Sequence, residues 1–292
     1  MIKNGFQHND KSIIAGWLPI YHDMGLIGNI LQPLYIGRPL YQISPTTFLQ
    51  NPITWLQIIS QYRATTSGAP NFAYDLCCDK IDDDLLKTLD LSSWQIAFNG
   101  SEPIKHKTFE RFAQKFKKSG FNPDSFFPCY GMAETTLFVS GNKKPKTTTI
   151  NREALKANKF IPTTQTYGSI KIVSSGNILN QEKQTIQIIN PKTNKKCEPN
   201  TIGEIWVHGP HVSSGYWNKK NVTKQTFSNK INNNQSKDYL RTGDLGYIDS
   251  SGNLYITGRL KDTIIIHGKN HYPQDIEDTV ENSHEALTKG AC

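Results

Sequence analysis

The sequence has little that would carry it into or across a membrane. Its longest unbroken aliphatic stretch is Ile264–Ile266, whereas a membrane helix needs about 18 apolar residues. The opening segment, Met1–Asp10, has no apolar core of the kind found in secretory signals. The five cysteines form an odd set without CxxC spacing, which argues against a zinc or redox site. We therefore expect reduced thiols in a soluble, intracellular protein of the cytoplasm.

The sequence also lacks a concentrated block of charge. Its 33 Lys and Arg exceed its 25 Asp and Glu, which gives a net charge of +8. The densest basic cluster is Lys115, Lys117 and Lys118. A basic excess suits a nucleic acid, an anionic membrane surface or an acidic protein partner. Scattered lysines without a recognition motif favour a solvated surface and no nucleic acid.

The chain has enough apolar material for a folded core. Of its 292 residues, 36% are hydrophobic and 10% are aromatic. A chain of this length buries about 75% of the surface that it exposes when unfolded. We therefore expect one large domain or two small ones, and we exclude a globally disordered chain.

The first half alternates short apolar runs with longer segments of helical periodicity. This pattern predicts strands and crossover helices in a mainly parallel sheet, an α/β fold. Asn51 is the expected cap of the second helix, and Gly120 ends the fourth. We predict helices at 25–36, 52–62, 71–80 and 105–118, and strands at 12–19, 38–44, 64–67, 94–98 and 125–129.

The second half changes character. Residues 142–166 are polar and rich in Lys and Thr, with a helix-capable piece at 151–158, and we interpret them as an insertion. The following segments alternate with period two between Pro, Gly and Asn turns, which predicts a β-rich unit in the form of a small β-barrel. Its clearest strands are 184–189, 203–207 and 253–257. The predicted divisions are 1–141, 142–166, 167–258 and 259–292.

Two glycine-containing turns follow predicted strands of the first half, where ligands collect in open α/β sheets. In Phe98–Pro103, glycine lets the backbone approach a flat ligand closely; an ordinary loop with Ser101 as a helix cap is the alternative. In Tyr130–Thr136, the aromatic ring offers a stacking face, the threonines offer hydroxyls for phosphate, and Glu134 offers an oxygen for Mg²⁺. A core tyrosine and a surface carboxylate are the alternative there.

Three further places carry candidate polar residues. Asp244 stands between two glycines and is suited to accept hydrogen bonds from both hydroxyls of a ribose, although Gly and Asp also form plain hairpin turns. The segment Thr257–Asp262 has the charges of a hinge that moves cations onto an anionic substrate, or of a plain linker. His22 ends a predicted strand among large apolar groups. It either lines a pocket or is a structural residue without a functional role.

Taken together, these motifs resemble the adenylate-forming ligase superfamily of acyl-CoA synthetases, adenylation domains and luciferases. Within it they are most similar to the fatty acyl-AMP ligases. The resemblance covers essentially the whole chain. It rests on seven stretches: GWLPIYHDMGLIG (16 to 28), SPTTFLQNPITWLQ (44 to 57), SGAPNFAYDLC (67 to 77), FNGSEPI (98 to 104), PCYGMAETTL (128 to 137), YLRTGDLGY (239 to 247) and GRLKDTIIIHGKNHYPQDIE (258 to 277).

The resemblance implies a fold and a set of site residues. The fold would be an α/β region and a β-barrel that form most of an N-terminal domain, joined by a hinge to a small mobile domain. The cofactors implied are ATP or AMP and Mg²⁺. In the implied site, Gly100, Ser101 and Glu102 border the adenine, and Tyr130, next to Gly131, stacks on it. Thr135 contacts the α-phosphate, and Glu134 holds Mg²⁺. Asp244 binds the ribose, Arg259 contacts ribose or phosphate, Lys261 is the pivot, and His22 lies beside the acyl carbonyl.

The reaction implied is the attack of a fatty carboxylate on the α-phosphorus of ATP, which gives an acyl-adenylate and pyrophosphate. The 142–166 segment lies where fatty acyl-AMP ligases carry an insertion, thought to restrict the motion needed for thioester formation with CoA. The resemblance therefore implies transfer to an acyl carrier protein or a polyketide synthase carrier domain. A long-chain acyl-CoA synthetase fragment is the alternative. A metal phosphohydrolase built on His22 and Asp23 lacks the further ligands that it needs.

Two departures from the family pattern point to a fragment. The family's Ser/Thr/Gly-rich phosphate loop should precede Trp17, yet the 16 residues before it form no such loop. The family's catalytic lysine should follow the small domain's first helix, and Lys261 and Lys269 stand in a different motif. We therefore expect a chain truncated at both ends, with impaired activity or none as a non-catalytic remnant. Its partners would then include the missing upstream and downstream segments.

Overall fold

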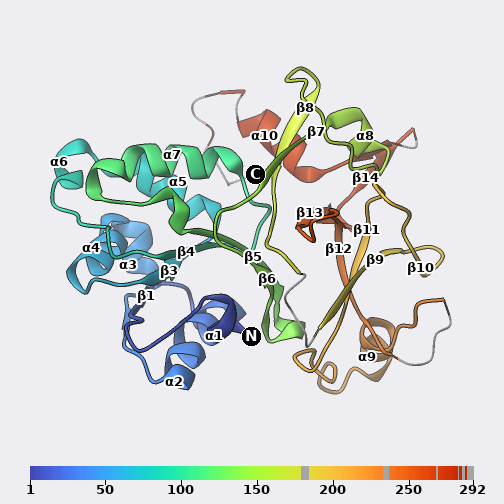
Figure 1. Ribbon diagram of the computed structural model, residues 1–292, viewed down its shortest axis with the longest axis horizontal. Coiled ribbons are helices and arrows are strands. Elements are labelled where there is room, and N and C mark those ends of the chain that lie inside the picture. Colours follow the sequence, from blue (N-terminus) through green and yellow to red (C-terminus); the bar gives the residue numbers. More distant parts are fainter. Residues whose placement is uncertain (179–183, 233–236, 268, 282, 285–286, 288–292) are drawn as a thin grey trace. The chain divides into compact units, whose positions relative to one another are not determined.

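The computed structural model describes residues 1–178, 184–232, 237–267, 269–281, 283–284 and 287 (Figure 1). The chain divides into two compact units, Met1–Lys146 and Thr147–Cys292, and each is described by itself. Among the residues described, no helix combines the length and the apolar character that crossing a membrane requires. The end of the predicted 259–292 unit, residues 288–292, lies outside the described residues.

A six-stranded sheet forms the centre of the first unit, with the order β2-β1-β3-β4-β5-β6. The neighbours from β2 to β5 pair in parallel, and β6 pairs antiparallel with β5. The predicted α/β region with a mainly parallel sheet is therefore confirmed. Its strands are β1 (Ile14–Gly16), β2 (Leu40–Gln42), β3 (Thr66–Gly68), β4 (Ile96–Asn99), β5 (Phe126–Met132) and β6 (Leu137–Gly141).

The helices of the first unit follow the predicted pattern, apart from a π-helix and three additional short helices. The predicted helix at 25–36 is a π-helix, η1 (Met24–Leu31), that continues into α2. The short helices α1, α3 and α6 were not predicted. The remaining helices match predicted ones. The α-helices are α1 (Ile2–Gly5), α2 (Gln32–Ile36), α3 (Pro45–Gln50), α4 (Ile53–Gln61), α5 (Asn71–Lys80), α6 (Asp83–Leu86) and α7 (His106–Phe116).

The predicted cap at Asn51 is wrong. Ser44 accepts a hydrogen bond from the Thr47 amide at 3.0 Å and starts α3, so Asn51 becomes the residue that ends this helix. Helix α4 begins after Pro52 without a side-chain cap. The capping side chain is therefore one helix upstream of the predicted position.

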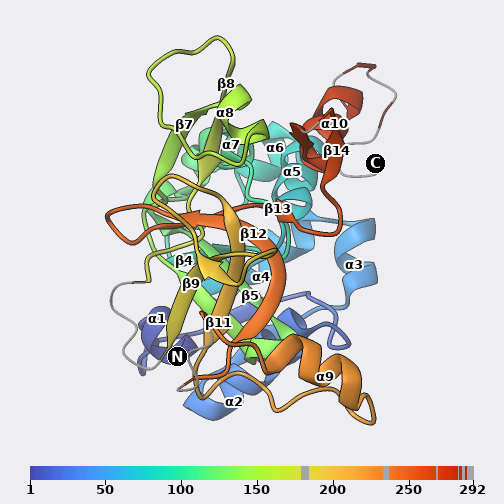
Figure 2. The same ribbon diagram turned by 90° about the vertical axis from the view of Figure 1, so that its right-hand side faces the viewer.

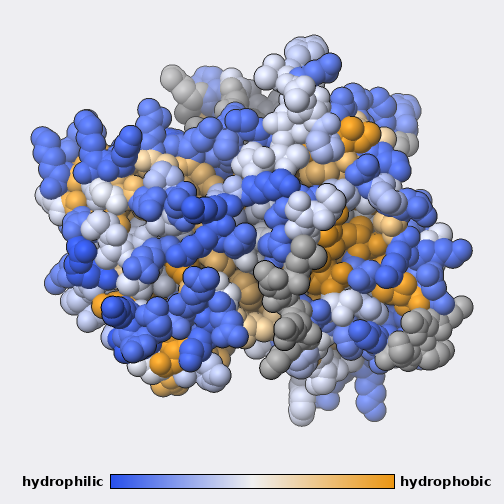
Figure 3. All heavy atoms as spheres, in the orientation of Figure 1, coloured by the Kyte–Doolittle hydropathy of each residue, from blue (hydrophilic) through white to orange (hydrophobic). Residues whose placement is uncertain are grey.

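Helix α7 shows how periodicity places a helix on the sheet. Its buried phenylalanines, Phe109, Phe112 and Phe116, are three and four residues apart and share one face. The helix runs beside α5 (Figure 1), and hydrophilic side chains cover the outer surface over α6 and α7 (Figure 3). A 3-10 turn, Lys117–Ser119, follows it, and Gly120 with a φ of 81° ends the helical segment as predicted.

Aromatic side chains fill the core of the first unit. The rings of Trp55, Tyr74, Trp94 and Phe112 are buried, with centroids 5.0–6.2 Å apart. The indole N–H of Trp55 donates to the Ser67 hydroxyl at 2.8 Å. The core therefore gains large apolar rings without leaving this polar atom unpaired.

The second unit is rich in strands, as predicted. A hairpin-like pair, β7 with β8, precedes a five-stranded antiparallel sheet of order β10-β9-β11-β12-β13, and a short pair, β14 with β15, follows it. The elements are β7 (Thr147–Asn151), α8 (Arg152–Lys156), β8 (Ser169–Val173), β9 (Thr185–Asn190), β10 (Lys195–Lys196), β11 (Gly203–His208), α9 (Lys220–Phe227), β12 (Leu240–Ile248), β13 (Leu254–Arg259), β14 (Ile264–Ile266), β15 (Lys269–His271) and α10 (Pro273–Glu281).

The five-stranded sheet differs from the predicted small β-barrel. A barrel needs its two edge strands to pair, but in the described residues the sheet ends at β10 and β13. The outer side of β13 is met by an irregular segment, since Ser175 N donates to Leu254 O at 2.7 Å and Leu254 N donates to Gly176 O at 2.9 Å. The described strands therefore form an open sheet with one covered edge.

His8 is a buried base in the first unit. Its Nε2 lies 3.2 Å from the Thr66 hydroxyl, and its Nδ1 lies 3.3 Å from Gln32 Nε2. Because Gln32 Nε2 is a donor, Nδ1 accepts and the proton of the neutral ring is on Nε2. Burial lowers the pKa of His8 from 6.5 to about 4, so the folded protein keeps this ring neutral.

Acidification should destabilise the fold through His8. The unfolded chain binds a proton at His8 below pH 6.5, whereas the folded chain binds it only near pH 4. Its stabilisation is therefore complete above pH 6.5 and is lost, by about 3 kcal/mol, as the pH falls towards 4. In urea unfolding at several pH values, His8→Gln should show a shallower pH dependence than the wild type. His208→Gln is the control, and equal slopes for the wild type and His8→Gln would contradict the assignment.

Candidate functional site

The loop after β4 lies tightly against the next strand. A Cβ on Gly100 would lie 3.0 Å from the carbonyl oxygen of Cys129 and 3.1 Å from its sulfur, so a larger residue there would crowd Cys129. Ser101 takes a left-handed backbone conformation with a φ of 69°, which costs about 1 kcal/mol or more outside glycine. The loop of the first motif and the start of the second motif are therefore neighbours.

Two side chains anchor this loop to the start of helix α5. The amide of Asn71 donates from Nδ2 to Pro103 O at 2.8 Å and accepts at Oδ1 from Lys105 N at 3.2 Å. Glu102 accepts at Oε1 from Phe72 N at 3.2 Å. Burial raises the pKa of Glu102. The Glu102 carboxylate is therefore an anchor on the first turn of α5, a role that the sequence analysis did not assign to it.

Asn99, the last residue of β4, is a candidate that the sequence analysis missed. It is fully buried, and neither atom of its side-chain amide has a hydrogen-bond partner in the described residues. Most buried polar groups are paired. An asparagine that ends a buried strand just before a glycine loop is the signal that would have drawn attention to it.

The second motif forms a tight turn between β5 and β6. A Cβ on Gly131 would lie 1.5 Å from Leu137 O, so only glycine fits there. Thr135 is fully buried, and its hydroxyl donates to Met132 O at 2.9 Å. Glu134 is half-buried in the same turn. The structure thus brings Tyr130, Gly131, Glu134 and Thr135 together, with the Thr135 hydroxyl hydrogen already in use.

His22 lies at the start of the π-helix η1 and is linked to the loop after β4. Its Nδ1 is 2.8 Å from Asp23 Oδ1, and its side chain is 51% exposed. The backbone N–H of Met24 donates to Asp23 Oδ1 at 2.7 Å and to His22 Nδ1 at 3.2 Å, so both side chains are held at the start of the helix. The Ser101 hydroxyl donates to the Met24 sulfur at 3.3 Å. The histidine segment and the Gly100–Glu102 loop therefore meet through Met24.

The acidic residues offer limited metal-binding capacity. In the described residues, no cluster of three or more His, Cys, Asp or Glu side chains could hold a metal ion. Mg²⁺ normally keeps several waters and is bound by one or two carboxylates together with substrate phosphates. The single carboxylate of Glu134 therefore fits Mg²⁺ bound jointly with a nucleotide.

In the second unit, Asp244 and Arg259 lie opposite each other on β12 and β13. Arg259 Nε is 3.3 Å from Asp244 Oδ1, and the Asp244 side chain is 12% exposed. Leu260 N donates to Gly243 O at 2.8 Å, which holds the end of β13 against this motif. Lys261 is exposed in the turn that follows. The structure thus brings the two predicted ribose contacts together, with the predicted pivot close to them in sequence.

A buried carboxylate, Glu204 on β11, organises the Asp244 strand. Glu204 is 2% exposed and accepts hydrogen bonds from Arg241 Nε at 3.0 Å, Trp206 Nε1 at 3.0 Å and Gly243 N at 3.2 Å. Arg241 also lies over the Trp206 ring, 5.5 Å from its centroid. Sequence reasoning missed this residue, although a lone carboxylate among the apolar residues of a predicted strand was a usable signal.

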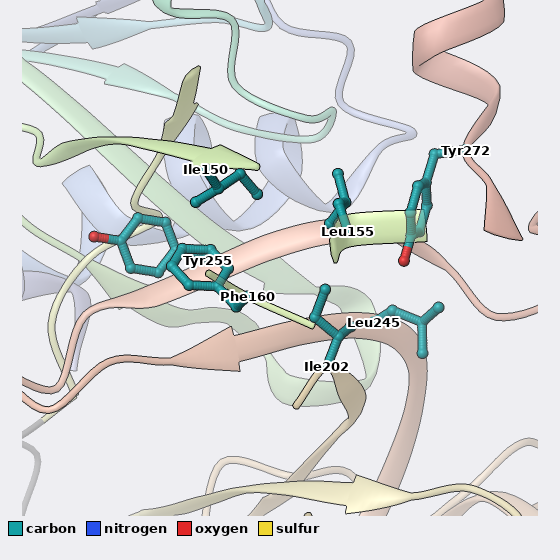
Figure 4. Close-up of a cluster of buried hydrophobic side chains, with 7 residues drawn as sticks. All are labelled: Ile150, Leu155, Phe160, Ile202, Leu245, Tyr255 and Tyr272. Atoms are coloured by element: carbon teal, nitrogen blue, oxygen red, sulfur yellow. The ribbon is translucent and has the colours of Figure 1, made fainter. Parts of the chain in front are cut away.

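The predicted insertion packs against the predicted hinge region. Tyr272, just after β15, is 2% exposed and belongs to one apolar cluster (Figure 4) with Ile150, Leu155, Phe160, Ile202, Leu245 and Tyr255. Asn270 Nδ2 donates to Lys156 O at 3.1 Å, and Lys269 Nζ lies 3.1 Å from Glu153 Oε2. The side chains of Lys156 and Lys269 lower the pKa of Glu153 to about 2. This attachment therefore combines apolar burial with polar contacts.

The site residues thus fall into two sets. His22, Gly100, Ser101, Glu102, Tyr130, Gly131, Glu134 and Thr135 belong to the first unit, and Asp244, Arg259 and Lys261 belong to the second. Within the first unit, contacts through Met24 and Cys129 join the three motif segments. Within the second unit, the β12–β13 pairing joins Asp244 and Arg259.

Replacing Glu204 with Gln should destabilise the second unit. The change places an amide N–H where a carboxylate oxygen now accepts from charged and neutral donors. Hydrogen bonds to a charged group are worth about 1.5 to 3 kcal/mol, so we expect the free energy of unfolding to fall by that amount in urea titrations. Glu198→Gln, at an exposed site of the same unit, should have little effect. Equal effects of the two variants would refute the role of Glu204.

Replacing Tyr272 with Ala should release the chain that follows β13. Deleting a buried aromatic ring costs about 3 to 5 kcal/mol, so amide exchange in β14, β15 and α10 should quicken at least 100-fold while exchange in the first unit stays unchanged. Tyr272→Phe keeps the ring and removes the hydroxyl, which lies 3.5 Å from Asn158 Oδ1. It should behave like the wild type; if it exchanges as fast as Tyr272→Ala, apolar packing is not what holds this segment.

Comparisons with known proteins bear on the family. A profile of the family described as AMP-binding enzyme matches residues 1–217. The chain is 43% identical over 302 residues to the medium-chain-fatty-acid--[acyl-carrier-protein] ligase TtuA of Teredinibacter turnerae, covering 100% of this chain and 47% of that protein. It is 37% identical to the putative fatty-acid--CoA ligase fadD25 of Mycobacterium tuberculosis, covering 96% of this chain and 48% of that protein.

A solved structure shares the fold. The crystal structure of fatty acid AMP ligase from Legionella pneumophila is 48% identical and superposes with a TM-score of 0.85, over 97% of this chain and 49% of that one. The chain spans about half the length of the curated relatives that it matches. The resemblance expected from the motifs is thus confirmed for family and fold: the chain belongs to the AMP-binding enzyme family.

Proposed function

We propose that this chain supplies nucleotide- and acyl-binding parts of an enzyme that activates a fatty acid with ATP and passes the acyl group to an acyl carrier protein. The observation that carries the proposal is the meeting of the His22, Gly100–Glu102 and Tyr130–Thr135 segments, through Met24 and Cys129, in a fold shared with fatty acid AMP ligases. Because the chain spans about half of its relatives' length, the complete reaction is proposed for the chain together with the remaining parts of such an enzyme. The cytoplasm stays the predicted compartment.

The first unit is proposed to receive the adenine and the acyl carbonyl. Gly100, Ser101 and Glu102 would border the adenine through their backbone, because the Glu102 carboxylate is held on α5. Tyr130 would stack on the base beside Gly131, where no side chain fits. Since the Thr135 hydroxyl donates to Met132, it would contact the α-phosphate by exchanging that bond. His22 would lie beside the acyl carbonyl.

The second unit is proposed to hold the ribose. The two oxygens of the Asp244 carboxylate can accept from two neighbouring hydroxyls, and Arg259 Nε lies 3.3 Å from Oδ1. Arg259 would also contact the ribose or a phosphate. Lys261, exposed in the turn after β13, is the proposed pivot for the residues that follow.

In the proposed reaction, a carboxylate oxygen of the fatty acid forms a bond to the α-phosphorus of ATP. The bond from that phosphorus to the oxygen bridging to the β-phosphate breaks, and pyrophosphate leaves with both electrons. Mg²⁺, with Glu134 as its proposed protein ligand, would neutralise phosphate charge. The residues of this chain contribute by binding, orientation and charge stabilisation, which are the main sources of acceleration in such transfers.

The attachment of residues 269–272 to the insertion supports transfer to a carrier protein rather than to CoA. In fatty acyl-AMP ligases, such an insertion is thought to restrict the motion needed for thioester formation with CoA. Here Tyr272 is buried in one cluster with Ile150, Leu155 and Phe160 of that region. An acyl-CoA synthetase fragment is the second candidate, and a relative named as a putative CoA ligase favours it. A thioester assay with CoA and carrier protein in parallel separates the two.

The first test of this function is nucleotide binding that depends on Asp244. Titration calorimetry with a non-hydrolysable acyl-adenylate analogue should show a loss of about 10- to 100-fold in affinity for Asp244→Asn, because hydrogen bonds to a charged group are lost. With the 2′,3′-dideoxyribose form of the analogue, wild type and variant should bind alike. Asp238→Asn, at an exposed carboxylate of the same unit, is the matched control. If Asp244→Asn loses the same affinity for both analogues, Asp244 does not bind the ribose hydroxyls.

A further inference from the structure

A tryptophan stands almost fully exposed among lysines at one end of the second unit. Trp217 is 89% exposed, and Val222 is 45% exposed. Lys219, Lys220 and Lys224 are exposed as well, and none of these three forms an ion pair with any residue in the part of the chain that the structure describes. We call these five residues the Trp217 surface. Tryptophan is among the residues that most often anchor a protein interface.

The Trp217 surface is held on a preformed support. Thr223 of α9 accepts at its hydroxyl from Tyr216 N at 2.9 Å. The ring of Tyr216 meets the buried ring of Phe227 with centroids 5.3 Å apart. Gly215 passes so close to Thr223 that a Cβ there would lie 2.1 Å from it. The loop before α9 is therefore fixed to the helix. Its backbone would lose little conformational entropy when a partner binds to Trp217.

The charge around this surface is of one sign. Residues 205–237 contain lysines at 219, 220, 224, 230 and 237 and no Asp or Glu. Lys230 is paired with Asp238 at 2.8 Å, whereas Lys219, Lys220 and Lys224 form no ion pair within the described residues. An exposed tryptophan surrounded by unpaired lysines combines an apolar anchor with attraction for an acidic surface.

We propose that the Trp217 surface is a docking site for an acidic carrier-protein domain. This inference rests on the proposed function, since it names the partner that would receive the acyl group. Trp217 and Val222 would bury against apolar side chains of the partner, and Lys219, Lys220 and Lys224 would face its carboxylates. The relatives that include [acyl-carrier-protein] in their names accord with such a partner.

Other polyanions fit this surface less well. A helix that lies on a membrane presents a broad apolar face, but α9 has two turns, and its large apolar residues are the exposed Val222 and the buried Phe227. Single-stranded nucleic acid is bound by several stacked aromatic rings along a basic groove, and the Trp217 surface has one ring. An acidic protein needs one aromatic anchor and a few cations, which is what this surface offers.

The Trp217 surface lies apart from the attachment between the insertion and the residues after β13. In Figures 1 and 2, α9 is at the opposite end of the second unit from α8 and α10. A partner docked at α9 therefore leaves the cluster around Tyr272 in place, and variants of the two regions test separate properties.

The experiment measures binding of a purified acidic acyl carrier protein in its apo form, without the phosphopantetheine arm, by titration calorimetry at about 0.05 and 0.2 M salt. The wild type should bind, and the affinity should fall with salt. Trp217→Ala should weaken binding at least 10-fold at both salt concentrations. The triple variant K219E/K220E/K224E should weaken it at least 10-fold at low salt and abolish the salt dependence. Both variants should unfold at the wild-type denaturant concentration, because these side chains are exposed.

The matched control reverses the same number of charges elsewhere in the second unit. Lys192, Lys195 and Lys196 are exposed, and K192E/K195E/K196E should bind the carrier within 2-fold of the wild type. A loss equal to that of the Trp217-surface triple variant would overturn the proposal in favour of unspecific attraction. Binding to vesicles of phosphatidylcholine with 30% phosphatidylglycerol, but not to the carrier, would overturn it in favour of a membrane.

The same samples are titrated with the acyl-adenylate analogue, which separates the two proposals. If every variant binds the analogue while the wild type does not bind the carrier, the docking site is refuted and the nucleotide site stands. If the wild type binds the carrier through Trp217 and the three lysines but not the analogue, the docking surface stands and the nucleotide site is refuted.

Discussion

The buried carboxylate of Glu204 is the interaction on which the geometry of the second unit depends. An ionised group out of water is stable only when its lone pairs are filled by well-placed donors. Glu204 obtains them from Arg241, Trp206 and Gly243, and these donors come from two neighbouring strands. These contacts join β11 to β12 in the register that the structure shows, and β12 also carries Asp244, which pairs with Arg259 on β13. The first unit uses the same principle with neutral groups: both ends of the Asn71 amide bond the Pro103–Lys105 segment.

These anchors allow the loop after β4 to keep features that folding alone would not favour. Ser101 takes a left-handed conformation, and the amide of Asn99 has no partner in the described residues. An unpaired buried polar group costs about 1 to 3 kcal/mol, and the backbone strain adds to that cost. Both lie at the carboxyl end of a parallel strand, where ligands bind in this fold class. A bound molecule with polar groups at this edge would recover part of the cost, so the loop is better suited to binding than to maximal stability.

The sequence predicted features that depend on local pattern and missed those that depend on distant partners. Helix α5 at Asn71–Lys80 and the end of the α7 segment at Gly120 follow from periodicity and from glycine's conformational freedom. The motif residues were found by their order along the chain. The role of Glu204 was missed because its donors Arg241 and Gly243 are more than 35 residues away. The β-barrel was predicted from the alternation of apolar and polar residues, which indicates strands. Whether strands close into a barrel depends on which edge strands pair, and alternation does not reveal that. Asn51 was misplaced because the Ser44 cap started an additional short helix before it.

Two regions of the second unit, the Tyr272 attachment and the Trp217 surface, differ in the interactions that would stabilise their contacts. The strength of these contacts should therefore depend differently on salt concentration. The Tyr272 attachment buries an aromatic ring, worth about 2 to 3 kcal/mol, whereas its ion pair between Lys269 and Glu153 joins side chains that are 60% and 61% exposed. Such exposed pairs contribute little to stability and are screened by salt. Apolar burial therefore dominates, and the attachment should persist at high ionic strength. At the proposed docking site, the lysines around Trp217 would attract an acidic partner over a longer range, so association there would weaken as the salt concentration rises. The two regions would therefore respond differently to salt: the internal attachment would persist while the proposed docking contact weakens.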